Sequence, residues 1–366
     1  MKIYISQYDS IKNSFYGGGG ARSSHQIAKF LSKKHKVVMI CGAYKNSNNE
    51  IIDKVFYKYI GFKWAGPKLG QFIYSLILPF YALKEDFDMW LENFQAPHST
   101  GFIPIFTKKP VIGITTILHA EDFSKKYKFP FHLIEKIGIK TYRHIIVSSL
   151  NLENKIRKFN KKANIKLIPP GIEKNLFRIK SQKGSHVLFI GRIDIYQKGI
   201  DLLLSIWSEV IKEQNIKLVI AGSGNPEEIK TVKQLIKKRG LGNHVVLKGR
   251  VDGKAKEDLL ANTVLGLSSS RFESFGIVAL EYMAAGKPFV CFDIEGFKWI
   301  PNSRSLKVWP FDTAIFAKKI IDLLKNQKLR EEIGEKGKTF AKNFDLDHVN
   351  RKIEFYISKV GRTYGI

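Results

Sequence analysis

The chain has 366 residues, of which 44% are hydrophobic, and a formal net charge of +28. That length exceeds what one hydrophobic core usually serves, so we expect two domains. The two cysteines, Cys41 and Cys291, lie far apart in apolar runs. This excludes a disulfide framework or CxxC metal knuckle and favours a reducing compartment. Because the N-terminal segment lacks the long apolar core of a secretion signal, we expect a cytoplasmic protein.

Positive charge is concentrated in the first half of the chain. Residues 1–183 hold 31 Lys and Arg against 12 Asp and Glu, a net charge of +19, which leaves +9 for residues 184–366. Such a field favours an anionic partner, whether nucleic acid, a membrane surface or a phosphorylated ligand. For most of the individual lysines, an ordinary role as a solvated surface residue is an equally good explanation.

Short apolar runs, each followed by an amphipathic stretch, recur along both halves of the chain. They begin near residues 2, 35, 88, 110 and 144, and again near residues 185, 216, 244, 263 and 288. This alternation predicts an α/β fold with parallel sheets and right-handed crossovers. Two such series predict two doubly wound, Rossmann-like domains.

The domain boundary is expected at a breaker-rich segment. Pro169, Pro170 and Gly171 open a polar, basic stretch, which predicts a linker near residues 170–184. We therefore assign residues 1–172 to the first domain and residues 173–345 to the second. The remaining residues, 346–366, predict a C-terminal helix that packs back on the first domain.

The most apolar stretch runs from Leu69 to Leu83 and has Pro79 inside it. It is shorter than the roughly 20 residues that a membrane-spanning helix requires. The sequence therefore predicts a buried or interfacial helix here.

Ligands of open parallel sheets bind beyond the carboxyl ends of the strands, so the loops there are candidate contacts. The first such loop contains four glycines, residues 17–20, followed by a helix. Glycine permits close backbone approach, and a helix start offers free N–H groups to an anion. The spacing fits neither a dinucleotide fingerprint nor a P-loop, and a merely flexible turn is the alternative.

A second loop, in "FIGRIDIYQKGIDLLL", carries two cations. Arg192 and Lys198 stand six residues apart between a strand and a helix, so both can reach one diphosphate. Two solvated cations are the alternative.

A third loop, "FESFGIVALE", places Glu273 and Glu281 eight positions apart, with the helix expected to begin near Ser274 or Phe275. Eight helical positions leave two side chains within roughly 80° of each other. Gly276 leaves the first turn bare, so its amides can meet phosphate oxygens. Carboxylates there would repel a lone phosphate and are expected to bind hydroxyls. A ligand with a diphosphate and polyol ends, a nucleotide sugar, satisfies all these groups.

Two further patterns are candidates for catalysis and for metal binding. His119 follows a strand in "GITTILHAEDF", where it is either catalytic or structural. Asp86 and Asp88 have the spacing of a metal-binding Asp-x-Asp, but no partner carboxylate lies nearby in sequence. We therefore expect no metal and no cofactor.

At this point the residues resemble family 4 of the retaining glycosyltransferases over nearly the whole chain. The motifs that carry the resemblance are, in order, "GGGGARSS", "TTILHAEDF", "VSSLNLENKI", "IPPGIEKNLF", "FIGRIDIYQKG", "IAGSG" and "ESFGIVALEYMAAGKPFV". It implies two Rossmann-like domains facing a central cleft, an acceptor side in the first, a nucleotide-diphosphate sugar in the second, and metal-independent hexosyl transfer.

The resemblance also implies roles for single residues. Arg192 and Lys198 would neutralise the diphosphate, Glu281 would bind the ribose hydroxyls and Glu273 the transferred sugar. His119 would lie near the anomeric carbon. The expected donor contacts also include Ser274, Phe275 and Gly276, with Gly18, Gly19 and Gly20 closing over the ligand. Ser274 stands where the family often has Gly, and four glycines stand where two are commoner.

The acceptor is expected on the first domain. Residues 121–145 interleave lysines with Phe, Leu and Ile, a composition typical of a helix lying on an anionic membrane and equally of an ordinary amphipathic helix. A peripheral location on the inner face of the cell membrane would fit a lipid-linked glycan or polysaccharide precursor as acceptor. One alternative is a nucleotide-sugar epimerase of similar build. The other is a basic nucleic-acid-binding protein, although no motif in the sequence matches a known nucleic-acid-binding class.

Overall fold

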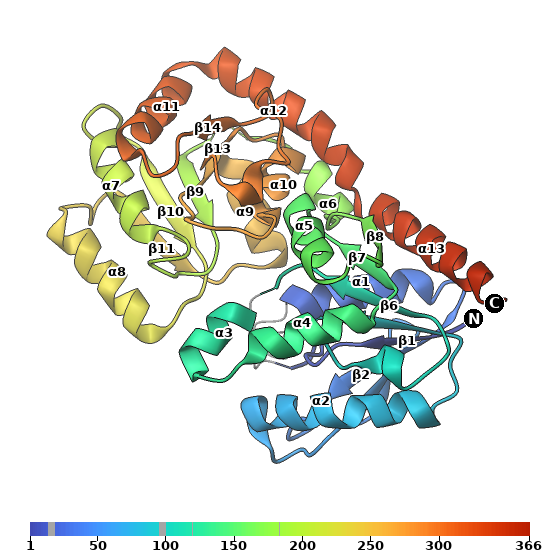
Figure 1. The fold of residues 1–366 in the computed structure, drawn as a ribbon. Helices are drawn as coiled ribbons and strands as arrows, with labels where there is room; N and C mark the ends of the chain where they lie inside the picture. The colour runs from blue at the N-terminus through green and yellow to red at the C-terminus, as the bar shows by residue number, and fades with distance from the viewer. Residues whose placement is uncertain (14–18, 95–99, 119, 183) are drawn as a thin grey trace. The chain divides into compact units, whose positions relative to one another are not determined.

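The computed structural model describes residues 1–13, 19–94, 100–118, 120–182 and 184–366. The chain divides into two compact units (Figure 1). Unit 1 comprises Met1–Pro170 and Asp347–Ile366, and unit 2 comprises Gly171–Leu346. Each unit is an α/β sandwich around its own sheet, as the alternation of apolar runs and amphipathic stretches predicts.

Unit 1 contains an 8-stranded sheet in the order β3-β4-β2-β1-β5-β6-β7-β8, parallel except for the β3–β4 pair. The strands are β1 (Lys2–Ser6), β2 (Lys36–Gly42), β3 (Glu50–Ile52), β4 (Val55–Ile60), β5 (Met89–Asn93), β6 (Val111–Thr115), β7 (His144–Val147) and β8 (Asn164–Leu167). The helices are α1 (Gly19–Leu31), α2 (Gly66–Lys84), α3 (Ala120–Tyr127), α4 (Phe131–Thr141), α5 (Leu150–Phe159) and α13 (Leu346–Thr363), with a 3-10 turn η1 (Ile103–Ile105).

Two separate hydrophobic clusters cover the two faces of this sheet. One contains side chains of α1 and α13, and the other contains side chains of α2, α4 and α5. Helix α13 buries one face of its amphipathic repeat, and its Tyr356 hydroxyl donates to the Asn164 carbonyl of β8 at 3.0 Å. The C-terminal helix therefore returns to the first unit, in agreement with the predicted fold class.

Unit 1 also buries a carboxyl group at the end of β5. Glu92 is 2% exposed and accepts hydrogen bonds from the Tyr142 hydroxyl and the Gly101 backbone N–H. Burial raises the pKa of Glu92 to about 7, although these two donors oppose the rise. The side chain ties the segment after β5 to the loop before β7.

Removing this carboxyl is expected to change how the stability of unit 1 depends on pH. A raised pKa means that the folded state holds a proton that the unfolded chain releases, so this contribution is fully present below pH about 4.5 and is lost as pH rises through about 7. The free energy of unfolding of Glu92→Gln, relative to that of wild type, should therefore rise by about 3 kcal/mol between pH 5 and 8. Denaturant unfolding of unit 1 at several pH values measures this difference. Glu213→Gln, an exposed carboxylate change in unit 2, is the control, and a difference that is constant with pH would contradict the expectation.

Helix α2, which contains the apolar stretch Leu69 to Leu83, is apolar on two faces. One face packs on the core through Tyr74, Leu78 and Ala82. The opposite face leaves five large apolar side chains exposed: Leu69, Phe72, Leu76, Phe80 and Leu83. Within the part of the chain that the structure describes, no helix is long and apolar enough to cross a membrane.

Unit 2 contains a 6-stranded parallel sheet in the order β11-β10-β9-β12-β13-β14. The strands are β9 (His186–Ile190), β10 (Lys217–Ala221), β11 (Val245–Gly249), β12 (Thr263–Ser268), β13 (Phe289–Phe292) and β14 (Leu306–Val308). The helices are α6 (Lys174–Phe177), α7 (Ile200–Val210), α8 (Pro226–Lys238), α9 (Gly253–Asn262), α10 (Ile277–Ala284), α11 (Thr313–Lys325) and α12 (Gln327–Ala341), with 3-10 turns η2 (Glu295–Phe297) and η3 (Lys342–Phe344).

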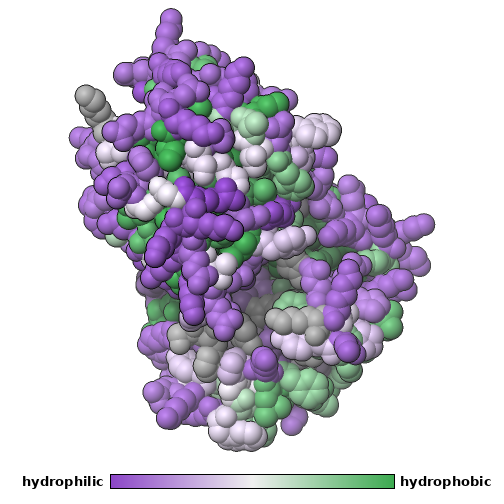
Figure 2. Space-filling view, turned by 90° about the vertical axis from the view of Figure 1, so that its left-hand side faces the viewer, coloured by the Kyte–Doolittle hydropathy of each residue, from purple (hydrophilic) through white to green (hydrophobic). Residues whose placement is uncertain are grey.

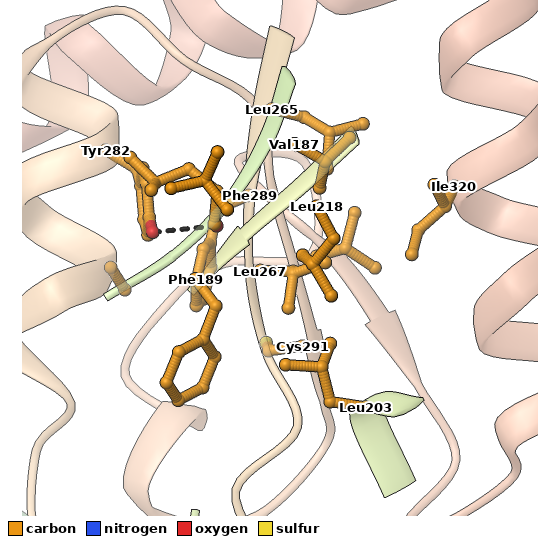
Figure 3. Close-up of a cluster of buried hydrophobic side chains, with 14 of the residues drawn as sticks. Val187, Phe189, Leu203, Leu218, Leu265, Leu267, Tyr282, Phe289, Cys291 and Ile320 are labelled. Atoms are coloured by element: carbon orange, nitrogen blue, oxygen red, sulfur yellow. Dashed lines mark hydrogen bonds between the residues drawn. The ribbon is translucent and has the colours of Figure 1, made fainter. Parts of the chain in front are cut away.

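The core of unit 2 is dense and largely aliphatic. Val187, Leu218 and Leu265 from neighbouring strands are fully buried, and Tyr282 and Phe289 stack beside them with centroids 5.7 Å apart (Figure 3). The Tyr282 hydroxyl donates to the Leu188 carbonyl at 2.8 Å, so helix α10 is tied to β9 as well as packed on it. This core fixes the strand ends that carry the candidate site.

Local signals set the helix starts. Ser149, Asn225 and Asp312 each accept a backbone N–H of the first turn of their helices, as polar N-cap residues usually do. Helix α10 differs because Gly276, at φ 68°, is its N-cap and offers no side chain. It begins at Ile277, two to three residues later than predicted. Gly276 has a left-handed backbone conformation, which is not helical, so the helix can begin only after it.

Candidate functional site

The loop after β9 carries the two predicted cations. The Asp194 carboxylate accepts the Gln197 backbone N–H at 2.7 Å, which folds the loop into a tight turn. The Arg192 guanidinium lies 3.1 Å from Asp194 and also donates to the Gln197 side chain. The Arg192 side chain remains 60% exposed, whereas that of Lys198 is largely buried.

Gly199 joins this loop to the loop after β12. It has φ 62°, which favours glycine, and a Cβ there would collide with the Ser269 carbonyl oxygen. The Ser269 hydroxyl donates to the Lys198 carbonyl at 2.9 Å. The backbone at Gly199 therefore allows the two loops to touch, and Lys198 lies at their contact.

The contact brings Lys198 and Glu273 together from positions 75 residues apart. The Lys198 ammonium lies 2.5 Å from Glu273 Oε1, and the Ser270 hydroxyl donates to the same oxygen at 2.8 Å. Both charged side chains are mostly buried. In this structure the two groups, expected to bind different parts of a ligand, neutralise each other.

The segment between Glu273 and α10 is held by aromatic packing. Phe275 stacks on Trp299 with centroids 4.5 Å apart, and the Trp299 indole N–H donates to the Phe275 carbonyl at 2.7 Å. Phe297 lies where a Cβ on Gly276 would be. The N-terminus of α10 therefore has a fixed position, and because its N-cap is a glycine, no N-cap side chain competes with an anion for its first amides.

Glu281, on the second turn of α10, has a partner that sequence reasoning missed. Its carboxylate lies 2.6 Å from the ammonium of Lys256 on α9, and both side chains are mostly buried. Lys256 stands in no recognisable motif, because the helix that carries it becomes a neighbour of α10 only through the fold. Ser274 lies between Glu273 and Phe275 in the same loop.

The remaining predicted residues belong to unit 1. Gly19 and Gly20 are the first residues of α1, with open space around the position of a Cβ on Gly19. Gly18 and His119 lie outside the described residues, so their roles stay predictions. Asp86 pairs with Lys109 at 3.2 Å, and in the described ranges no cluster of three or more His, Cys, Asp or Glu is arranged to hold a metal.

The predicted site residues of unit 2 thus lie in the segments that follow the neighbouring strands β9 and β12, and the structure brings Lys198 into contact with Glu273. Arg192, Lys198 and the α10 amides are groups of the kind that can bind phosphate oxygens. Glu273 and Glu281 are acceptors suited to hydroxyl groups. Such a set can hold one molecule that carries both kinds of group.

The chain is similar to known glycosyltransferases in sequence and in fold. Residues 172–340 match the family described as "Glycosyl transferases group 1". The phosphatidyl-myo-inositol mannosyltransferase of Mycobacterium leprae is 31% identical over 174 residues, 46% of this chain and 45% of that protein. Alignments with the first three curated relatives span only 31%, 45% and 44% of those proteins' lengths.

Two solved structures cover nearly the whole chain. Sucrose-phosphate synthase from Thermosynechococcus elongatus has a TM-score of 0.82 at 17% identity, covering 99% of each chain. Anabaena HepE in complex with UDP-glucose has a TM-score of 0.76 at 16% identity, covering 98% of this chain and 100% of that one. Residues 172–340 thus match the model of the group 1 glycosyl transferases, and the chain as a whole has the two-domain type B glycosyltransferase fold.

Proposed function

We propose that the protein is a retaining glycosyltransferase that moves a hexose from a nucleotide-diphosphate sugar to a hydroxyl acceptor without a metal ion. The observation that carries this proposal is the contact between the Arg192 and Lys198 loop and the Glu273 loop, beside the bare start of α10. The printed complex of HepE with UDP-glucose supports a nucleotide-sugar donor.

The proposed role of the cations is to stabilise the leaving group. As the glycosidic bond breaks, negative charge develops on the departing diphosphate, and Arg192, Lys198 and the α10 amides would bind it. Lys198 would exchange its bond with Glu273 for one with a phosphate oxygen. Glu273 is then free to accept a hydrogen bond from the transferred sugar.

The carboxylate at Glu281 is proposed to hold the ribose hydroxyls. Its ion pair with Lys256 orients the carboxylate through one oxygen, while the second carboxylate oxygen can accept hydrogen bonds. The acceptor hydroxyl would attack from the face that the diphosphate leaves, assisted by a leaving oxygen, and this course retains the anomeric configuration.

Product analysis tests the proposed reaction. UDP-, GDP- and ADP-sugars are first ranked by the thermal stabilisation they give, because a ligand stabilises only the state that binds it. The preferred donor is then incubated with and without a lipid extract, and NMR follows nucleoside diphosphate release and the anomeric configuration.

We expect release that depends on the acceptor and a product that retains the anomeric configuration of the donor. Conversion of the nucleotide sugar without any acceptor would identify an epimerase instead, and an inverted product would overturn the retaining mechanism.

We propose further that the acceptor is lipid-linked and that unit 1 lies against an anionic membrane on the cytoplasmic side. Besides the exposed apolar face of α2, unit 1 has the short helices α3 and α4, which leave Tyr127, Leu133 and Ile137 exposed. The Lys68 ammonium lies 5.8 Å from the Tyr127 ring, which places the start of α2 beside the end of α3. The name of the mycobacterial relative also specifies a lipid acceptor.

The charges around this surface favour a bilayer. Helix α2 carries Lys68 and Lys84 and no acidic residue, and the single acid of α4, Glu135, is buried. Helix α3 has two acids, Glu121 and Asp122, both in its first turn. Apolar side chains flanked by cations are typical of interfacial helices on anionic lipids. On the face drawn in Figure 2 hydrophilic residues predominate and hydrophobic ones reach the surface in patches.

Vesicle flotation tests the membrane surface. The protein should float with phosphatidylglycerol vesicles at low salt and much less at 0.5 M salt, where the Debye length is only several Å. Leu69→Ser together with Leu76→Ser should reduce the bound fraction at least about tenfold, since each change removes roughly 1.5–3 kcal/mol of apolar burial. Ile315→Ser, an equally exposed apolar residue of unit 2, is the matched control. Equal flotation of the double variant and wild type would refute this surface.

A further inference from the structure

A hollow lies in unit 2 at the ends of β13 and β14, apart from the residues of the proposed donor site. It holds about 630 Å³ of space, its open mouth included. The sheet order places β14 at the edge, two strands from β12. The lining residues are Asp293, Asn302, Ser305, Leu306, Lys307, Val308, Trp309 and Lys319.

Trp309 forms part of the wall of this hollow and is 80% exposed. It directly follows β14, and its carbonyl accepts the Asp312 backbone N–H at 3.2 Å, closing a turn. Phe311 in that turn adopts φ 69°, a conformation that bulky residues rarely adopt, and its ring packs edge-on against Phe292 at 5.6 Å. A fixed turn thus holds a large aromatic face in solvent, although burying it would be favourable.

The lining of the hollow includes a buried hydroxyl without a partner and a mostly buried cation. Ser305 is 2% exposed, and its hydroxyl has no hydrogen-bond partner among the described residues. Buried polar groups are nearly always satisfied in folded proteins. The Lys307 side chain is 10% exposed, and its ammonium forms a long ion pair with the Asp293 carboxylate at 3.7 Å. An unsatisfied hydroxyl and a loosely paired cation in one hollow favour a polar ligand.

We propose that this hollow binds one ring of an acidic saccharide, a uronate residue of a glycan chain. Trp309 offers a flat surface for the C–H face of a pyranose ring. Ser305 and Asp293 can hydrogen bond its hydroxyl groups, and Lys307 pairs with its carboxylate. The inference goes beyond the proposed function, because none of the residues that would hold the donor takes part. It gives unit 2 a second carbohydrate site, one suited to a longer acidic glycan.

Calorimetric titration of the full chain with tetragalacturonate tests the proposal, with maltotetraose as the neutral probe. Wild type should bind tetragalacturonate at least tenfold more tightly than maltotetraose. Trp309→Ala and Lys307→Met should each weaken tetragalacturonate binding at least tenfold. Trp64→Ala, a similarly exposed tryptophan in unit 1, should bind like wild type.

The controls separate a saccharide site from other outcomes. Trp309 is exposed, so Trp309→Ala should keep the wild-type melting temperature and the wild-type rate of donor turnover, which distinguishes failure here from failure of the proposed function. Inorganic sulfate should compete weakly. Each of three results would overturn the proposal: wild type fails to bind tetragalacturonate, Trp309→Ala binds it as tightly as wild type, or sulfate competes as effectively as the sugar itself.

Discussion

Replacing Lys198 by alanine should lower the turnover of glycosyl transfer by about 100-fold or more, the usual cost of removing one preorganised charge-stabilising group. The ammonium is mostly buried at the contact of two loops, where it is shielded from water and close to where the diphosphate is proposed to lie. The loss should appear in kcat measured by nucleoside diphosphate release.

The matched control for Lys198→Ala is Lys212→Ala. Lys212 lies just beyond α7 in the same unit, is exposed and pairs with Glu209 at 2.7 Å, so its loss should leave turnover unchanged. Equal melting temperatures would show that both variants fold. Transfer by Lys198→Ala at nearly the wild-type rate would exclude Lys198 from the site.

Gly199→Ala is expected to damage both stability and activity. The added Cβ would meet the Ser269 carbonyl and would also force alanine into a left-handed conformation. Unit 2 should lose at least about 2 kcal/mol of unfolding free energy. Because Lys198 precedes this residue, turnover should fall as well, even at temperatures where the variant remains folded.

The stability part of this prediction has its own control. Gly242 has open space around the position of a Cβ and no left-handed backbone, so Gly242→Ala should be nearly neutral. Denaturant titration of both variants compares the two directly. Equal stability of Gly199→Ala and Gly242→Ala would show that the two loops do not need the close approach at Gly199.

The sequence predicts the sheets well where strands are buried on both faces. The ten apolar runs correspond to strands β1, β2, β5, β6, β7, β9, β10, β11, β12 and β13. The strands it misses are short or lie toward the edge of a sheet: β3, β4, β8 and β14. Edge strands bury less apolar surface and therefore carry a weaker pattern. The β3–β4 turn depends on positive φ at Asp53 and Lys54; aspartate is among the residues that favour this conformation, but lysine is not, so the pair is a weak turn signal.

The site is predictable only where the residues of one loop act together. The spacing of Arg192 and Lys198 and the position of Gly276 can be read locally, because each depends on a single strand-to-helix loop. The ion pairs of Glu273 with Lys198 and of Glu281 with Lys256 depend on which loops and helices become neighbours. Likewise, the pattern of residues 69–83 predicts a helix but not that α2 exposes one of its two apolar faces.

The most direct test of the proposed donor site is a crystal structure with bound UDP or GDP, whichever stabilises the protein more. The diphosphate oxygens should lie within about 3.2 Å of the Arg192 guanidinium and the Lys198 ammonium, with the ribose hydroxyls donating to Glu281. A nucleotide bound elsewhere, with Lys198 still paired to Glu273 and Arg192 directed into solvent, would contradict the proposed function.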